Sequence, residues 1–453
     1  MQQPPSQTPT EPETVDLAEP KASAQSKGSP TSLTCPTCIS PTNTAAFEFS
    51  WLQTLFATTF RELQSDPLRT NLLIPPGDDC AEVLLETLDR FHDESLASLA
   101  DKHPASPDGP IKGSSDRVPG SSVLFASDML MDGVHFNLKE IHPSWVGAKA
   151  VRVNLSDIAA MAGTPLSITV SLALPRIGGA SIGQEVMEGV ATTCRAYGLT
   201  IAGGDTNTWN GPLVISVAIL GLPYHKQSLT RHGAQVGDEI FVSGPLGGSL
   251  HSGRHLCPEP RLDLARLLRE KYAVTSMMDL SDGLGSDLRH ILRASNVGAC
   301  LERRWIPLHR DLFLEDNEAL DRRGRFRAPM VLVKEGNPQH TEGNQPFPVG
   351  NSQTDTKLEG PERDRLIDKA LSDGEDFEIC WTMPPWAGAQ LRQDLLSGRH
   401  NRAPGGLRPL DLSQVAITQI GVITDSSEKL TWTDGSPVLS RGYEHKLDSL
   451  RPP

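Results

Sequence analysis

The chain has 453 residues, and 42 Lys and Arg against 56 Asp and Glu leave a formal net charge of −14. Nucleic-acid-binding surfaces are basic, so this balance argues against a nucleic-acid partner. Hydrophobic residues make up 38% of the chain, and no stretch approaches the roughly 18 uncharged apolar residues of a membrane-spanning helix, which argues against an integral membrane protein.

The first 46 residues are rich in Pro, Ser, Thr and Gln and contain almost no large apolar side chains, so we expect them to be disordered. They begin with neither a basic nor an apolar signal region. Cys35 and Cys38 form a CxxC in this tail, but a structural zinc site needs four ligands and no second pair follows, so we interpret them as incidental. The seven cysteines do not resemble a disulfide framework, which favours the reducing cytoplasm.

The first folded element is predicted over 47–63, where apolar residues recur at helical spacing. Residues 89–120 are rich in Pro, Ser, Asp and His and are predicted to be an insertion. A buried strand is predicted over 123–127. The next helix begins at Pro143 and ends at Gly163, because apolar residues recur every three or four positions between them.

The rest of the first half alternates between strand and helix patterns. The predicted elements are a half-buried strand over 167–175, a helix over about 181–197, a strand over 199–202 and a strand over 213–221. Gly203, Gly204 and Asp205 are interpreted as a turn after the third of these elements. We place the end of the first domain near Leu222.

The second half contains the same two kinds of pattern. Strands are predicted over 241–244, 377–382 and 415–424, and helices over 261–272, 283–295 and 384–397. A second insertion is predicted over about 337–363, where Gly, Pro, Asn and Gln dominate. The pattern predicts an α/β fold of mixed layers with two domains, 47–222 and 223–450.

Acidic residues recur in short glycine-containing turns at the ends of apolar strands, where solvated surface charge is least expected. Six motifs hold eleven of them: Asp78 and Asp79; Asp128 and Asp132; Asp157; Asp205; Asp279, Asp282 and Asp287; and Glu375 and Asp376. Any one motif alone is typical of an ordinary turn, but six together indicate a site. Their summed charge is nearly as large as the whole acidic excess.

Converging carboxylates repel one another unless cations neutralise them. Scattered single Asp residues suit Mg²⁺, which retains its own waters and binds substrate phosphates. Zinc fits poorly, because His135 has no regularly spaced His or Cys partner. The sequence contains neither a P-loop nor a dinucleotide-binding glycine motif, so we expect a nucleotide to be held through Mg²⁺.

The ordered motifs GDDCAEV, ASDMLMDGVHF, NLSDIAAMAGTPL, AGGDT, RHGAQVGDEIFVSGPLG, DLSDGLGSDL and GEDFEI resemble the thiamine-monophosphate kinase family over about 47–447. The resemblance implies transfer of the γ-phosphoryl group of ATP to thiamine monophosphate, which makes thiamine diphosphate. It also implies the two-domain α/β fold shared with aminoimidazole ribonucleotide synthetase, and a homodimer formed through the N-terminal domains.

The resemblance assigns roles by motif. It implies Mg²⁺ positions at Asp79, Ser127, Asp128, Asp157, Asp205, Asp279 and Asp282, nucleotide positions at Gly204, Asp205, Arg231, Ser281 and Met187, and thiamine-phosphate positions at His135, Glu375 and Tyr443. Asp128, Asp205 and Asp282 are expected to matter most. Phosphoryl transfer to an ionised phosphate needs positioning and charge neutralisation, so no general base is assigned.

Three positions depart from the family pattern. Ala126 replaces a Ser or Thr, Met187 replaces a Tyr beside the adenine, and Phe377 replaces the Tyr of GEDYE. None of these changes removes a carboxylate, so we expect altered affinity with retained activity.

Two alternatives stay open at this point. One is another ATP-using enzyme of the same fold, such as aminoimidazole ribonucleotide synthetase, selenophosphate synthetase or the hydrogenase-maturation dehydratase, although DGVHF replaces the DGVGTK of the first. The other is a non-catalytic nucleotide-binding scaffold, which would be free to lose the carboxylates that this chain retains.

Overall fold

A computed structural model describes residues 72–74, 78–84, 122–224, 228–313, 360–397, 415–439 and 442, which all belong to one compact unit, Glu48–Pro453. The predicted tail with its CxxC, the predicted helix over 47–63 and the predicted insertion over 89–120 lie outside the described residues. Tyr443 lies outside them as well.

The first sheet has six strands in the order β1-β2-β3-β6-β4-β5. They are β1 (Leu72–Ile74), β2 (Ala81–Leu84), β3 (Ser122–Met131), β4 (Gly163–Pro175), β5 (Thr200–Trp209) and β6 (Val214–Pro223). Only β4 and β5 pair in parallel. Parallel neighbours need a crossover connection, which helix α5 (Gly179–Tyr197) provides.

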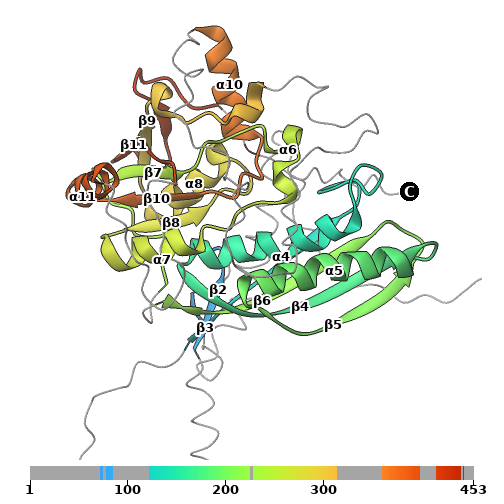
Figure 1. The fold of residues 1–453 in the computed structure, drawn as a ribbon. Helices are drawn as coiled ribbons and strands as arrows, with labels where there is room; N and C mark the ends of the chain where they lie inside the picture. Colours follow the sequence, from blue (N-terminus) through green and yellow to red (C-terminus); the bar gives the residue numbers. More distant parts are fainter. Residues whose placement is uncertain are drawn as a thin grey trace, which may run out of the picture. The chain divides into compact units, whose positions relative to one another are not determined.

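Helix α4 (Pro143–Ala160) and α5 lie side by side against this sheet (Figure 1). Two glycines allow the helices to approach closely. A Cβ on Gly147 would lie 2.0 Å from the carbonyl oxygen of Val186, and one on Gly189 would lie 1.8 Å from that of Ser144. Any larger residue at either position would push the two helices apart.

The second sheet has the order β12-β9-β11-β7-β10-β8. Its strands are β7 (Glu239–Ser243), β8 (Ser276–Asp279), β9 (Gly298–Leu301), β10 (Ile379–Met383), β11 (Ile417–Thr424) and β12 (Leu430–Trp432). Its helices are α6 (Ser249–Ser252), α7 (Leu262–Lys271), α8 (Leu284–Ser295), α10 (Pro361–Ser372) and α11 (Pro385–Leu396), with 3₁₀ turns at Arg254–Leu256, Arg303–Trp305 and Arg310–Phe313.

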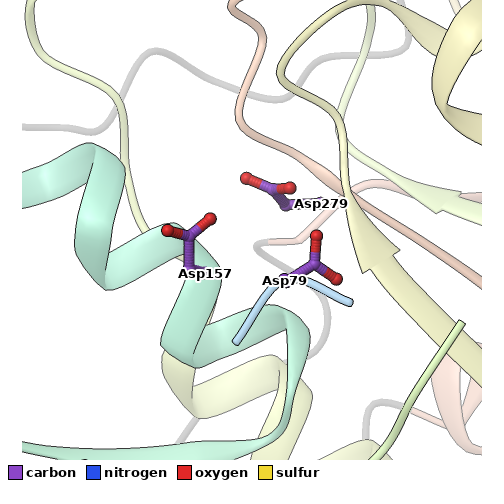
Figure 2. A group of neighbouring side chains, drawn as sticks. All are labelled: Asp79, Asp157 and Asp279. Carbon is purple, nitrogen blue, oxygen red and sulfur yellow. The ribbon is translucent and has the colours of Figure 1, made fainter. Parts of the chain in front are cut away.

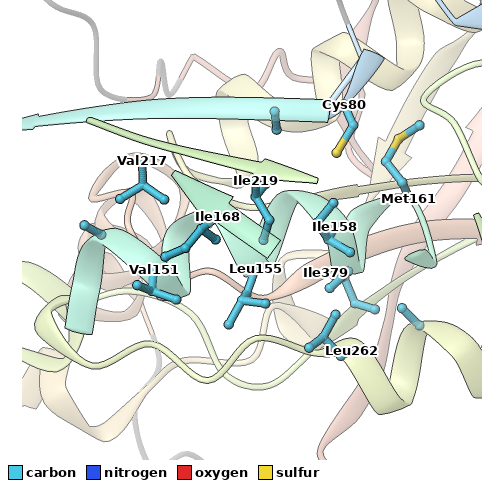
Figure 3. Packing of buried hydrophobic residues seen from close by; sticks show 14 of the residues in the cluster. Cys80, Val151, Leu155, Ile158, Met161, Ile168, Val217, Ile219, Leu262 and Ile379 are labelled. Atoms are coloured by element: carbon cyan, nitrogen blue, oxygen red, sulfur yellow. The ribbon is translucent and has the colours of Figure 1, made fainter. Parts of the chain in front are cut away.

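Helix α4 is buried on nearly every side. Leu155 and Ile158 belong to one hydrophobic cluster with Ile219 of the first sheet and with Leu262 and Ile379 of the second half (Figure 3). A helix that packs on both sides has few solvent-facing positions. Charged side chains on α4 therefore have few positions at which they can face solvent.

The predicted α/β fold of mixed layers is confirmed, and the main predicted helices and strands are present within a few residues of their bounds. The changeover from the first sheet to the second falls between β6 and β7, while the division into two domains stays a prediction. No helix among the described residues is long and apolar enough to cross a membrane.

One prediction was wrong in detail. Gly203, Gly204 and Asp205 lie within strand β5 and do not form a turn, because β4 and β5 approach closely there: a Cβ on Gly204 would lie 1.8 Å from the carbonyl oxygen of Val170. A register irregularity at Ile168 accompanies this approach. Most of the second predicted insertion, 337–359, lies outside the described residues, and its last residues, 361–363, form the first turn of α10, which Pro361 begins.

Candidate active site

Three predicted metal-binding residues converge in the structure. Carboxylate oxygens of Asp79, Asp157 and Asp279 lie within 4.8 Å of one another (Figure 2). Asp79 lies just before β2, Asp157 lies in the last turn of α4, and Asp279 ends β8. Segments from three distant parts of the chain thus bring their carboxylates to one place. This is the one group of that kind among the residues the structure describes.

The electrostatics of this group favour a cation. Burial and the neighbouring carboxylates raise the pKa of Asp157 and of Asp279 well above their usual values. Asp279 accepts a hydrogen bond from the Ser156 hydroxyl at 2.6 Å. Asp79 Oδ2 is buried and has no hydrogen-bond partner. A buried, unpartnered carboxylate oxygen beside two further carboxylates fits a hard divalent cation such as Mg²⁺.

Asp128 lies beside this group on β3. Burial raises its pKa to about 6, and a hydrogen bond with the Asp157 side chain partly opposes that rise. Ser127 is exposed, and alternation along the strand directs its side chain to the opposite face from Asp128. The metal role of Ser127 therefore stays a prediction.

Arg231 forms the cationic side of the group. Its Nη2 donates to Asp79 Oδ1 at 2.5 Å, and its backbone N–H donates to both carboxylate oxygens of Asp78, at 3.1 and 3.2 Å. Burial and Asp79 raise the pKa of Asp78 to about 7. The guanidinium predicted to contact nucleotide phosphates thus lies against the predicted metal ligands.

The loop after β8 carries Ser281 and Asp282 and is shaped by Asp287. Asp287 Oδ2 accepts hydrogen bonds from the backbone N–H groups of Asp282, at 3.1 Å, and Gly283, at 3.0 Å. The Ser281 carbonyl oxygen accepts from the Glu375 backbone N–H at 2.6 Å. Asp287, one of the eleven acidic residues of the motifs, therefore orders the loop that presents Asp282.

Three predicted residues lie apart from Asp79, Asp157 and Asp279, which together form the Asp79 group. Gly204 and Asp205 are exposed on the edge strand β5, where Asp205 accepts hydrogen bonds from the Thr206 backbone N–H at 2.8 Å and the Asn207 amide at 3.1 Å. Met187 is partly buried and packs against the main hydrophobic cluster. The nucleotide and metal roles of these residues stay predictions.

On the substrate side, His135 and Glu375 are joined by a residue that the sequence analysis missed. Lys149 of α4 donates from Nζ to the His135 carbonyl oxygen at 3.0 Å and to Glu375 Oε2 at 2.5 Å. Its side chain is fully buried. The signal was present in the sequence, because Lys149 is the one charged residue in the otherwise apolar stretch from Val146 to Val151.

Asp376, the other acidic residue of the GEDF turn, has a supporting role. It accepts hydrogen bonds from the Gly247 backbone N–H at 2.9 and 3.1 Å and from Arg254 Nη2 at 2.9 Å. Burial raises its pKa to about 6, and Arg254 opposes that rise. Asp376 therefore holds the glycine-rich loop after β7 against the GEDF turn.

The model of the family AIR synthase related protein, N-terminal domain, matches residues 114–222. A thiamine-monophosphate kinase of Rhodopirellula baltica is 46% identical over 201 residues, which span 44% of this chain and 62% of that protein. Among solved structures, the thiamine-monophosphate kinase of Stenotrophomonas maltophilia K279a has 25% sequence identity and a TM-score of 0.51, covering 79% of this chain and 99% of that one.

The structure of AaThiL complexed with AMPPCP and TMP has a similar fold, with a TM-score of 0.57 at 23% identity, covering 90% of this chain and 100% of that one. The thiamine-monophosphate kinase of Escherichia coli K12 is 30% identical over 347 residues, which span 72% of this chain and 86% of that protein. A match over 72% of this chain is longer than either half of the chain alone. The chain therefore belongs to the thiamine-monophosphate kinase family.

Proposed function

We propose that the chain transfers the γ-phosphoryl group of ATP to thiamine monophosphate, giving thiamine diphosphate and ADP in thiamine diphosphate biosynthesis. The observation that carries this proposal is the convergence of Asp79, Asp157 and Asp279 within 4.8 Å in a member of this family. An all-oxygen group of this kind suits Mg²⁺, the ion that accompanies ATP in phosphoryl transfer. Because ATP is made and used in the cytoplasm, we expect the reaction there.

The Asp79 group would hold Mg²⁺, with Asp128, Asp282 and Asp205 as the further carboxylates that the family resemblance implies. When bound, the metal ions neutralise phosphate charge and align the two reacting phosphates. The acceptor oxygen belongs to a phosphate that is already ionised at neutral pH. The chain therefore needs no general base, and its own residues bind, orient and neutralise.

Arg231 provides a fixed positive charge on the nucleotide side. The hydrogen bond from its guanidinium to Asp79 at 2.5 Å supports this role, because it holds the cation at the edge of the predicted metal group. Ser281 and Gly204 would contribute further nucleotide contacts, and Met187 an apolar contact to the adenine.

His135 and Glu375 would bind the thiamine phosphate, with Tyr443 packing on the cationic thiazolium. The link from His135 through Lys149 to Glu375 supports a shared role for the first two residues, because it places segments from both halves of the chain on one side of the site. A carboxylate beside the thiazolium ring also favours a cationic substrate.

We further propose that the chain forms a homodimer through its first sheet. Strand β5 lies at the sheet edge, and all ten of its residues are exposed, including Ile201 and Trp209. An edge strand with exposed apolar side chains is a ready pairing surface for a second copy. Light scattering coupled to gel filtration should give twice the chain mass, and a monomer at all concentrations would contradict this proposal.

The activity is tested with purified chain, ATP, Mg²⁺ and thiamine monophosphate, followed by mass spectrometry of the products. Thiamine diphosphate and ADP should form in equal amounts. Asp279→Asn should abolish formation of both products. Asp394→Asn is the control, because it alters a carboxylate that accepts a hydrogen bond from the Tyr272 hydroxyl in the second half of the chain, and it should leave the rate unchanged. Release of ADP without thiamine diphosphate would contradict the kinase proposal and favour another ATP-using enzyme of this fold.

A further inference from the structure

We infer that Lys149 is a positioning residue that fixes the Glu375 carboxylate and the His135 segment on the substrate side of the site. The inference rests on the proposed function, because the substrate contacts of His135 and Glu375 belong to that proposal. Nothing in the family resemblance assigns a role to Lys149 itself.

One ammonium group ties together two segments that are far apart in the chain. Lys149 Nζ donates to the carbonyl oxygen of His135, which follows β3, and to the side chain of Glu375, which precedes β10 and lies 226 positions from Lys149. The Lys149 side chain has 0% exposure, and that of Glu375 has 19%. The carboxylate is therefore anchored from within the protein and still reaches solvent.

The segment that carries Glu375 is under local backbone strain. Glu375 and Phe377 both have positive φ values, +53° and +51°, which side chains other than glycine seldom adopt. The backbone is held there by hydrogen bonds from Glu375 N–H to Ser281 at 2.6 Å and from Phe377 N–H to Leu280 at 2.8 Å. These bonds fix the main chain, whereas the bond from Lys149 sets the direction of the Glu375 carboxylate.

Burying a lysine at this position costs desolvation free energy that an apolar residue would not lose. Burial lowers the pKa of Lys149, and the Glu375 carboxylate opposes that shift. The neighbours of Lys149 on α4, Val146, Ala150 and Val151, are buried and apolar, so methionine would fill the same space without desolvating a charge. Orienting a substrate-side carboxylate accounts for a charge at this position.

The test compares Lys149→Met with a matched control on the same helix. Arg152 also reaches from α4 to the second half, where its Nη1 donates to the Pro258 carbonyl oxygen at 3.0 Å, but it contacts neither His135 nor Glu375. Loss of a charge-assisted hydrogen bond to Glu375 should raise the KM for thiamine monophosphate by roughly 10- to 100-fold in Lys149→Met. The KM for ATP should change less than about threefold, and Arg152→Met should leave both constants near wild type.

A double variant separates positioning from general damage. If Lys149 acts through Glu375, Lys149→Met combined with Glu375→Gln should be no worse for thiamine monophosphate than the more severe single variant. Glu375→Gln alone keeps the test valid if Lys149→Met does not fold, because it removes the same ion pair from a partly exposed position. The inference is overturned if the effects of the two substitutions on thiamine monophosphate multiply in the double variant. It is also overturned if Lys149→Met raises the KM for ATP as much as the KM for thiamine monophosphate.

Amide hydrogen exchange provides a readout that does not depend on turnover. Lys149→Met should speed exchange in the segment 374–378, while strands β7 and β11 keep wild-type rates. If the wild-type chain makes no thiamine diphosphate, the proposed function fails, and the exchange result still decides whether Lys149 holds Glu375. A lower melting temperature with unchanged exchange in 374–378 would show a purely structural role and overturn the inference.

Discussion

Replacing Asp157 with Asn should stabilise the metal-free chain and remove most of its stabilisation by Mg²⁺. Without metal, three carboxylates lie within 4.8 Å of one another, and Asp157 takes part in two of the three close pairs. At 4.8 Å each like-charge pair costs about 3 kcal/mol with an effective dielectric constant of about 20. Protonation of a carboxylate relieves part of this repulsion. At pH 7, protonating a carboxyl of ordinary pKa costs about 4 kcal/mol, so the repulsion cannot destabilise the fold by more than that for each carboxyl. Asp157→Asn should therefore raise the free energy of unfolding in metal-free buffer by about 2–4 kcal/mol.

With Mg²⁺ most of this difference in stability between the variant and the wild type should disappear. A ligand at about 100 times its Kd stabilises the folded state by roughly 2.7 kcal/mol, and Asp157→Asn should lose most of that gain. Thermal unfolding of both proteins is measured in EDTA and over a Mg²⁺ titration, with Asp394→Asn as the control outside the group. Lower stability of Asp157→Asn in EDTA, together with an unchanged response to Mg²⁺, would refute the reasoning.

Two further predictions concern other charged groups. In metal-free buffer the unfolding free energy should fall as pH rises from about 4 to about 7, because folded Asp78, with a pKa of about 7 against 3.8 unfolded, and folded Asp128, with a pKa of about 6, retain protons that the unfolded chain has lost. Asp78→Asn should flatten this slope in melting curves recorded across that range, and a slope equal to that of the wild type would contradict the assignment. Arg261→Met should cost about 3–5 kcal/mol in urea unfolding, because it leaves buried Glu378 without its bidentate partner, with bonds of 2.7 and 2.5 Å. A loss below about 1 kcal/mol would show that the Ser243 hydroxyl, at 2.6 Å, satisfies Glu378 by itself.

Local patterns in the sequence predict the elements that position the site. Helix α4 and strand β4 follow from apolar periodicity, because buried apolar residues recur along each of them at the spacing of a helix or a strand. The convergence of Asp79, Asp157 and Asp279 follows from their recurrence at element ends, where turns bring carboxylates to one edge. Short strands such as β9 and β12 contain too few residues to show a period, and pairing with their neighbours determines them.

Pairing between distant residues explains what the sequence alone does not predict. The contact between Lys149 and Glu375 joins positions 226 residues apart, and neither local pattern indicates the other. The glycines at 203 and 204 are typical of a turn, but the neighbouring strand requires them in β5. Asp79, Glu375 and Asp376 pair with Arg231, Lys149 and Arg254. Side chains therefore neutralise part of the charge of the six acidic motifs.

The measurement that tests the central claim most directly follows the labelled phosphate from [γ-³²P]ATP in the presence of thiamine monophosphate and Mg²⁺. The account predicts that the label appears in thiamine diphosphate, that EDTA prevents its appearance, and that Asp157→Asn transfers none while Arg152→Met transfers at the wild-type rate. Label found only in inorganic phosphate, or transfer that persists in Asp157→Asn, would contradict the account.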